Sequence, residues 1–254
     1  MRTAKDGPTL IGSVQRALRL LEAAGSHANG APAKQLARET GLALGTTYHL
    51  LRTLVHEGYL QRLSDGGYVL GDRIDGLRQD SREQAMLTRV RPTLTSLRDE
   101  LSAATYLCFY EDGEIRVRDV VDGPKAPRTE MWVGFADGGH ATALGKCVLG
   151  SLSDAARRDY LARHPLYDLT PNTAKNTSDL LRRLDEERRG GLALDREEYL
   201  IGTACAAVPI TDGTRIGALG VSVHASRLDG IQAARHRLTA TAARVTRTLS
   251  LNGI

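Results

Sequence analysis

Residues 13–70 read SVQRALRLLEAAGSHANGAPAKQLARETGLALGTTYHLLRTLVHEGYLQRLSDGGYVL, and this stretch decides the fold of the N-terminal part of the chain. It begins with Ser13, whose hydroxyl can cap a helix by accepting from an unpaired backbone N–H. Apolar side chains then recur at helical spacing and predict an amphipathic helix that ends near Gly25. The predicted apolar stripe consists of Val14, Ala17, Leu18, Leu21 and Ala24.

Two more helices are predicted, separated by a short turn that contains a glycine. The first begins at Pro32, where a missing N–H is tolerated, and ends at Thr40. Gly41 follows and suits the left-handed position that closes many helices. The second runs from about Gly45 to His56. Two helices joined in this way predict a helix-turn-helix.

Beyond Gly58 the hydrophobic period changes from helical to alternating. Residues 59–63 alternate between apolar and polar side chains and predict a strand. Residues 64–67 (SDGG) predict a turn, and residues 68–70 predict the second strand of a hairpin. An Asp-Gly pair between alternating segments is a strong hairpin signal. The stretch therefore predicts a winged helix-turn-helix. The alternative, a plain three-helix packing unit with an added hairpin, is disfavoured because helix lengths, turn and hairpin all agree.

A module of this kind places its second helix in the major groove of DNA. In that helix Leu50, Leu51 and Leu54 face the core, and Thr47 is expected to pack beside them. Arg52 is the best-placed cation for a phosphate or a guanine. Each outward residue can equally be an ordinary solvated side chain. The candidate DNA contacts are Lys34, Thr46, Thr47, Tyr48, His49, Arg52 and Arg62.

Length and charge limit how such a module can bind. The chain has 254 residues, which is room for two domains, and a net charge of +4 with a pI of about 9.1. Residues 1–76 hold 9 Lys and Arg against 7 Asp and Glu, so this part is only weakly basic. We therefore expect two modules to bind one DNA site together, which favours a homo-oligomer, a dimer or a dimer of dimers, on a palindromic operator.

Three widely spaced cysteines without a CxxC motif argue against a disulfide framework and for a reducing compartment. No apolar run has transmembrane length, and the polar residues 1–12 do not resemble a signal peptide. We expect a cytoplasmic protein with no membrane association.

The rest of the chain predicts an α+β domain with one central sheet, because helical segments alternate with antiparallel hairpins. A mostly helical connector precedes it, and Pro92 within this connector predicts the start of a new helix. The expected organisation is an N-terminal arm (1–9), a winged helix-turn-helix domain (10–72), a helical linker (73–90) and the second domain (91–254).

The sequence resembles the IclR family of bacterial transcriptional regulators. The segments SVQRALRLLEAAG, QLARETGL, TTYHLLRTLVHEGYL and YVLGDRIDGL match its N-terminal domain. HATALGKCVL, GLALDREEYLIGTACAAVPI and GALGVSV follow its effector domain in order and spacing. One departure lies in the recognition helix, where Leu44, Gly45 and His49 replace the basic and hydroxyl residues common in the family.

The resemblance implies a GAF-like effector domain that binds a small organic or aromatic acid. It implies main-chain donors at the start of a short helix, which suit an anion. Asp195 opposes a carboxylate unless Asp195 is protonated or meets a hydroxyl or amine. His224, where relatives often carry serine, is a second departure. The implied effector-binding residues are Ala143, Leu144, Asp195, Cys205, Ser222 and His224, with Trp132 as an apolar wall or as ordinary core.

Three functions were compared on these grounds. An enzyme or metal site is disfavoured, because His140, Cys147, Cys205 and His224 match no zinc spacing and no phosphate loop or nucleophile elbow occurs. We expect no cofactor and no metal. A ligand-independent DNA-binding regulator with a degenerate pocket is the alternative. The favoured interpretation is a transcriptional regulator, by resemblance a repressor, whose operator binding is controlled by a small-molecule effector.

Overall fold

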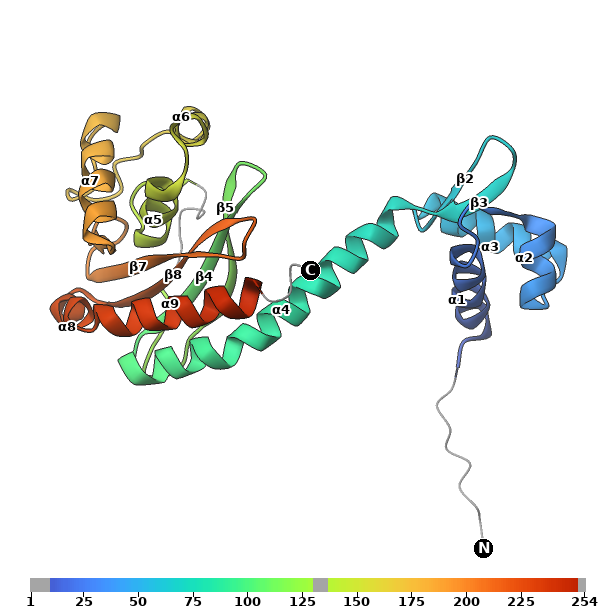
Figure 1. Cartoon of the computed structure of the whole chain (residues 1–254), viewed down its shortest axis with the longest axis horizontal. Helices are drawn as coiled ribbons and strands as arrows, with labels where there is room; N and C mark the ends of the chain where they lie inside the picture. Colours follow the sequence, from blue (N-terminus) through green and yellow to red (C-terminus); the bar gives the residue numbers. More distant parts are fainter. Residues whose placement is uncertain (1–9, 130–136, 251–254) are drawn as a thin grey trace, which may run out of the picture. The chain divides into compact units, whose positions relative to one another are not determined.

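The computed structural model describes residues 10–129 and 137–250. The chain divides into two compact units, residues 1–84 and 85–254, and helix α4 (Asp72–Leu101) contributes to both (Figure 1). Within the described residues no helix is long and apolar enough to cross a membrane.

The first unit packs three helices against a small sheet. Its core is built from Leu20, Leu36, Leu51, Leu60 and Tyr68. The helix-turn-helix is formed by α2 and α3, and Gly41 closes α2 with a left-handed φ of 68°. The elements are α1 (Gly12–Gly25), β1 (Ala31–Pro32), α2 (Ala33–Thr40), α3 (Leu44–His56), β2 (Leu60–Arg62) and β3 (Gly67–Leu70).

The wing has one strand more than the sequence predicted. The short β1 pairs with β3, with Ala31 opposite Tyr68 and Pro32 opposite Gly67, so the sheet order is β1-β3-β2. A pair of residues carries no alternating pattern of its own, and only the approach of β3 makes this segment a strand.

Helix α1 differs from its prediction at both the cap and the buried face. It begins at Gly12 after Ile11, and no side chain caps it, so the expected Ser13 cap is wrong. Leu20 and Ala24 are buried, whereas Val14 and Leu18 are 52% and 54% exposed. At 3.6 residues per turn Leu18 lies about 160° around the helix from Leu20. The helix thus has two apolar faces, of which the module's core covers one.

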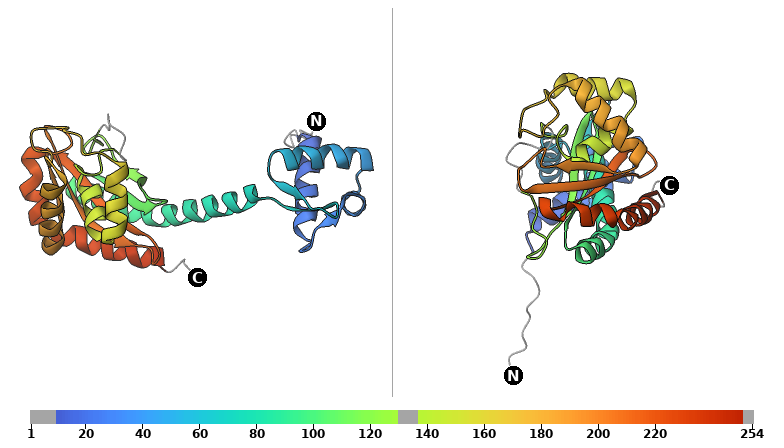
Figure 2. Two further views of the ribbon diagram at one scale, coloured as in Figure 1. Left: turned by 90° about the horizontal axis from the view of Figure 1, so that it is seen from above. Right: turned by 90° about the vertical axis from the view of Figure 1, so that its left-hand side faces the viewer.

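The second unit is built on a five-stranded antiparallel sheet of order β5-β4-β8-β7-β6. This confirms the α+β class. Helices α5, α6 and α7 lie on one face, while α8, α9 and part of α4 cover the other (Figures 1 and 2). The strands are β4 (Ala104–Glu111), β5 (Glu114–Val121), β6 (Ala193–Arg196), β7 (Thr203–Thr211) and β8 (Ile216–His224). The remaining helices are α5 (Ala143–Ser151), α6 (Asp154–Arg163), α7 (Thr177–Gly190), η1 (Ala225–Arg227), α8 (Leu228–Ala233) and α9 (Arg235–Ser250).

The expected new helix at Pro92 is wrong, because α4 continues through this residue. Proline lacks an N–H for the carbonyl four residues earlier and disfavours a helix interior. Here Val90, Leu94 and Leu97 form one fully buried stripe against the sheet. Burial of this stripe on both sides of the proline outweighs the lost hydrogen bond, since tertiary packing overrides local propensity.

Candidate functional site

The outer face of α3 presents a mixed polar and apolar surface. Leu44, Tyr48 and Arg52 follow one another at four-residue intervals and share this face, and all three are exposed. His49 is also exposed, and Thr46 is half-buried beside them. The face can therefore offer a guanidinium, an imidazole and a phenol to a DNA groove. It adds one hydroxyl, from Thr46, and one apolar side chain, from Leu44.

Three other candidate contacts fall at different places in the module. Lys34 is exposed on α2. Arg62 is exposed on β2, with its guanidinium carbon 6.0 Å from the centre of the Tyr68 ring. Thr47 is fully buried, and its hydroxyl donates to the Ala43 carbonyl over 3.1 Å. The Thr47 side chain therefore packs in the core, as its spacing predicted, and its place among the candidate DNA contacts is wrong.

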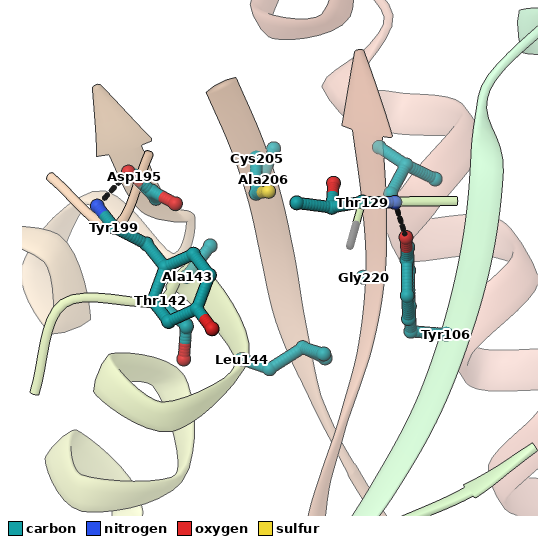
Figure 3. Close-up of a pocket in the computed structure, with 11 residues that line it drawn as sticks. Tyr106, Thr129, Thr142, Ala143, Leu144, Asp195, Tyr199, Cys205, Ala206 and Gly220 are labelled. Atoms are coloured by element: carbon teal, nitrogen blue, oxygen red, sulfur yellow. Dashed lines mark hydrogen bonds between the residues drawn. The ribbon is translucent and has the colours of Figure 1, made fainter. Parts of the chain in front are cut away.

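The second unit contains a pocket between the start of α5 and strands β4, β6, β7 and β8 (Figure 3). It holds about 380 Å³ of space outside the protein atoms, part of it open to solvent. Its described lining consists of Tyr106, Thr129, Thr142, Ala143, Leu144, Asp195, Tyr199, Cys205, Ala206, Gly220 and Val221.

One wall of the pocket is the first turn of α5. Thr142 is the N-cap residue, and its hydroxyl accepts from the Gly145 N–H at 3.0 Å. The N–H groups of Ala143 and Leu144 lie in the same turn, where a helix offers no internal acceptor. A Cβ on Gly145 would lie 2.0 Å from the Gly139 oxygen, so only glycine allows this close approach. The turn combines free donors with the positive end of a helix dipole.

Asp195 supplies the acidic group of the pocket. It is 1% exposed, and its Oδ1 accepts from the N–H groups of Glu198 at 2.7 Å and Tyr199 at 3.3 Å. Burial raises the pKa of Asp195 to about 7, against the opposing effects of these N–H donors and of the Lys146 charge. Near neutral pH this carboxyl therefore exists in both protonation states.

A buried ion network lies next to Asp195. The Lys146 ammonium has a fully buried side chain and contacts Glu198 at 2.6 Å and Glu187 at 2.9 Å. Arg183 reaches the other oxygen of Glu198 at 3.2 Å. Burial raises the pKa of Glu187, and the Lys146 charge opposes that rise. The network connects α5 and α7 to the loop that follows β6. It therefore fixes the position of α5 relative to the segment that carries Asp195.

The opposite wall is organised by Tyr106 on β4. Its hydroxyl accepts from the Thr129 N–H at 2.8 Å (Figure 3). The same hydroxyl lies 3.1 Å from the Ser222 hydroxyl. Gly220 is the cross-strand neighbour of Tyr106 on β8. A Cβ on Gly220 would lie 2.7 Å from a methyl carbon of Leu144, so the glycine makes room for that side chain.

Comparisons with known proteins match both parts of the chain to domains of one family. Residues 13–64 match the IclR helix-turn-helix domain, and residues 81–250 match the C-terminal domain of the bacterial transcriptional regulator IclR. The chain belongs to the IclR family. It is a DNA-binding transcriptional regulator with an effector domain, and its family consists of regulators rather than enzymes.

Several IclR relatives span nearly the whole chain. The transcriptional regulator XynR of Escherichia coli is 29% identical over 237 residues, which is 90% of this chain and 92% of that protein. The transcriptional repressor IclR of Escherichia coli is 26% identical and covers 86% of this chain and 82% of its own. A solved IclR homologue from Microbacterium hydrocarbonoxydans, complexed with 4-hydroxybenzoate, has a TM-score of 0.59 and 22% identity, covering 94% of this chain and 99% of that one.

The structure brings four of the residues implied by the IclR resemblance to the pocket. Ala143, Leu144, Asp195 and Cys205 line it. Burial raises the pKa of the Cys205 thiol well above its usual value, which favours a neutral lining group over a reactive thiolate. The described residues contain no group of three His, Cys, Asp or Glu side chains arranged to hold a metal ion.

The other three implied residues lie elsewhere. Ser222 is buried behind Tyr106 and acts on the pocket through that hydroxyl. His224 is at the exposed end of β8, where its Nδ1 accepts from the Ser226 N–H at 3.3 Å and caps η1, so its place in the pocket is wrong. Strand direction rather than residue type decides this, because β8 leaves the pocket before its last residue. Trp132 lies outside the described residues.

Sequence reasoning missed four polar lining residues of the IclR pocket. Tyr106, Thr129, Thr142 and Tyr199 come from four separate segments. One of them carried a local signal, since Thr142 precedes a helix rich in small residues and is a favourable N-cap. The others reach the pocket through strand pairing and loop closure, which no short pattern encodes.

Proposed function

We propose that this IclR-family regulator is a repressor whose binding to a palindromic operator is controlled by a small organic or aromatic acid. The observation that carries this proposal is the pocket at the start of α5. It joins unpaired helix-start donors to an apolar lining, and such donors favour a negatively charged group. Repression is proposed from relatives whose names describe repressors.

The class of effector is supported by the chemistry of the pocket lining and by one homologue. The solved IclR homologue from Microbacterium hydrocarbonoxydans is complexed with 4-hydroxybenzoate, which is an aromatic acid. Leu144 offers an apolar surface for a ring or short chain, while Ala143 and Leu144 offer N–H groups to its acid end.

For the DNA we propose contacts from the exposed face of α3 and its neighbours. Arg52 would meet a phosphate or a guanine, and Tyr48 and His49 would reach bases or phosphates. Lys34, Thr46 and Arg62 would add backbone contacts from α2, α3 and the wing. The helix-turn-helix match supports this use of α3, because the second helix of that motif enters the major groove.

We further propose that the protein binds its operator as a homodimer or a dimer of dimers. The second apolar face of α1, formed by Ile11, Val14 and Leu18, is exposed to between 52% and 66%. Isolated exposed apolar residues are ordinary, but three at helical spacing on one face favour a partner. A second copy of this chain fits, since a weakly basic module gains affinity by binding two half-sites.

The first experiment is a thermal-shift screen of the full chain against small organic acids, aromatic acids and amino acids, with 4-hydroxybenzoate included. A ligand that binds only the folded state stabilises it by about 2.7 kcal/mol at a hundredfold excess over its Kd. The operator is obtained by selection from random DNA, and each hit is tested for release of that DNA. Control by an effector requires unequal affinity for the free and DNA-bound states.

His224→Ala is the matched control in this screen, because His224 lies at the exposed end of the same strand as Ser222. We expect it to leave binding unchanged, whereas Ser222→Ala weakens it. Selection of a DNA site that no tested acid, amino acid or amide affects would favour the alternative, a ligand-independent regulator. Failure to select any DNA site would refute the proposed operator binding.

A further inference from the structure

The described lining of the pocket contains an acid but no base. Of the described residues that line it, none is lysine, arginine or histidine, and Asp195 is the one carboxyl. An acidic effector would therefore place a second carboxylate near Asp195 without a cationic side chain on the pocket surface. Two buried carboxylates side by side cannot both stay ionised at low cost, because like charges repel strongly where water is excluded.

The cations nearby, buried Lys146 and half-buried Arg183, are already matched to other carboxylates. Lys146 on α5 is held by Glu187 on α7 and by Glu198, which follows β6. Arg183 on α7 is held by Glu198 and by Asp179. Among the described residues no ion pair joins Asp195 to Lys146 or Arg183, and its Oδ1 accepts from two backbone N–H groups instead. Asp195 is thus a buried carboxyl without a direct counter-ion.

We infer that an acidic effector binds in this pocket with a proton shared between its carboxylate and Asp195, so that binding takes up one proton from solvent. The inference rests on the proposed function and specifies how its pocket tolerates an acid. A protonated Asp195 becomes a hydrogen-bond donor to the ligand, while the N–H groups of Ala143 and Leu144 remain for the rest of the carboxylate. The protein would then recognise an anion with one neutral acid and helix-start amides.

The surroundings of Asp195 favour this proton over a bare charge. Burial raises its pKa to about 7, although Lys146 on α5 and the N–H groups after β6 oppose the rise. From the other elements, Glu198 adds a like charge, and Cys205 on β7 is a neutral thiol directly across the strand pair. Glu187 and Arg183 on α7 face Lys146 and Glu198 rather than Asp195. An added carboxylate raises the pKa of the shared site further.

The inference predicts a specific pH dependence. Small carboxylic acids have pKa values of about 4, so they are ionised throughout the range from pH 6 to pH 9. Below about pH 7 free Asp195 already holds the proton, and affinity is constant. Above that value the proton must be taken from solvent, so affinity falls about tenfold per pH unit. An uncharged amide of the same shape shares no proton, and its affinity lacks this fall.

The test uses the full chain and pairs of probes, each a small acid and its primary amide, such as 4-hydroxybenzoate with 4-hydroxybenzamide. Isothermal titration calorimetry in two buffers of different ionisation enthalpy counts the protons taken up directly. At pH 8.5 we expect about one proton per acid bound, and at pH 5.5 about none. Acid binding without proton uptake at pH 8.5 would overturn the inference and leave the proposed function standing.

The variant Asp195→Asn provides a second test of the shared proton. Its side-chain oxygen can still accept from the two N–H groups, and its NH₂ donates permanently in place of the shared proton. We expect the variant to bind the acid without proton uptake and about tenfold or more tightly than the native chain at pH 8.5. Asp229→Asn removes an exposed carboxyl from the same unit and should keep the native proton count. An unchanged pH slope in Asp195→Asn would contradict the assignment, and the native calorimetry decides the matter if this variant does not fold. Absence of any acid binder would instead refute the acid-sensing part of the proposed function.

Discussion

The hydroxyl oxygens of Tyr106 and Ser222 lie 3.1 Å apart, and this contact links strand β4 to strand β8 behind the pocket. The same Tyr106 hydroxyl accepts from the Thr129 N–H, so one phenol connects three segments that are distant in sequence. Both hydroxyl-bearing residues are buried, at 4% exposure each. The pocket surface therefore depends on Ser222 without including it.

Removing this phenol oxygen should loosen the pocket wall. Tyr106→Phe leaves the Thr129 N–H and the Ser222 hydroxyl without their partner, and a buried unsatisfied group costs about 1–3 kcal/mol. We expect a loss of unfolding free energy of that order in chemical denaturation, together with weaker effector binding. Tyr167→Phe, at an exposed tyrosine, is the matched control. Native-like stability of Tyr106→Phe would show that this hydrogen-bonded junction is dispensable.

Arg52 should contribute to DNA binding alone. Arg52→Ala removes the cation from the exposed face of α3, so operator affinity falls, and the salt dependence weakens by about one unit of slope if the contact is a phosphate. Effector affinity stays native because the pocket lies in the other unit. Gel-shift titration over a range of salt concentrations measures this. Arg19→Ala, an exposed arginine on α1, is the control. Loss of effector binding in Arg52→Ala would contradict the separation of the two sites.

The exposed face of α1 should control self-association. Leu18→Glu places a charge in the apolar face of Ile11, Val14 and Leu18, so we expect the dissociation constant of the dimer to rise at least tenfold. Sedimentation measures the oligomer, and affinity for a palindromic site should fall with it. Ser13→Glu introduces the same charge at an exposed position outside this face. A native dissociation constant for the Leu18→Glu dimer would exclude α1 as the interface.

Asp195 should make the folded protein less stable as pH rises. Its folded pKa of about 7 lies above the usual value of 3.8, so between these values the unfolded chain releases a proton that the folded chain keeps. Stability contributed by this residue therefore falls from about pH 4 to pH 7 and is level above that. Asp195→Asn removes the effect. Relative to the native chain, the free energy of unfolding of the variant should therefore be higher at pH 8 than at pH 4, by on the order of a few kcal/mol.

Denaturant titrations of the native chain and of Asp195→Asn at pH 4.5, 6 and 8 measure this difference. Asp229→Asn is again the control, since its carboxyl is exposed. Parallel pH profiles for the native chain and Asp195→Asn would mean that Asp195 is ionised in the folded state at neutral pH.

Local patterns predicted the elements that depend on nearby residues. The pair α2 and α3, the left-handed Gly41 between them and the Asp-Gly turn of the wing are each encoded within a few positions. The sequence likewise predicts Ser153 as the cap of a helix that begins at Asp154, and in α6 its hydroxyl accepts from the Ala156 N–H at 3.3 Å. Helix caps and tight turns are predictable because their hydrogen bonds close over three or four residues.

Features that depend on tertiary packing differ from what the local sequence predicts. Both Val14 and Leu20 are apolar residues on one helix, yet only Leu20 meets the core. Pro92 disfavours a helix interior, yet burial of its neighbours keeps α4 continuous. The sequence predicts Thr177 or Ser178 as the cap of α7, but Asn176 takes this place, because the preceding loop sets where the helix begins.

By itself, the sequence determined the helix-turn-helix, the α+β class and the family, since these follow from periodicity, turn residues and ordered motifs. Only the tertiary structure decided which side chains form the pocket. Tyr106 faces Gly220 because strand register joins residues more than a hundred positions apart. Asp195 is buried beside paired charges because α5 and the loop after β6 meet there. Such long-range pairing sets burial, and burial sets the charge state on which effector chemistry depends.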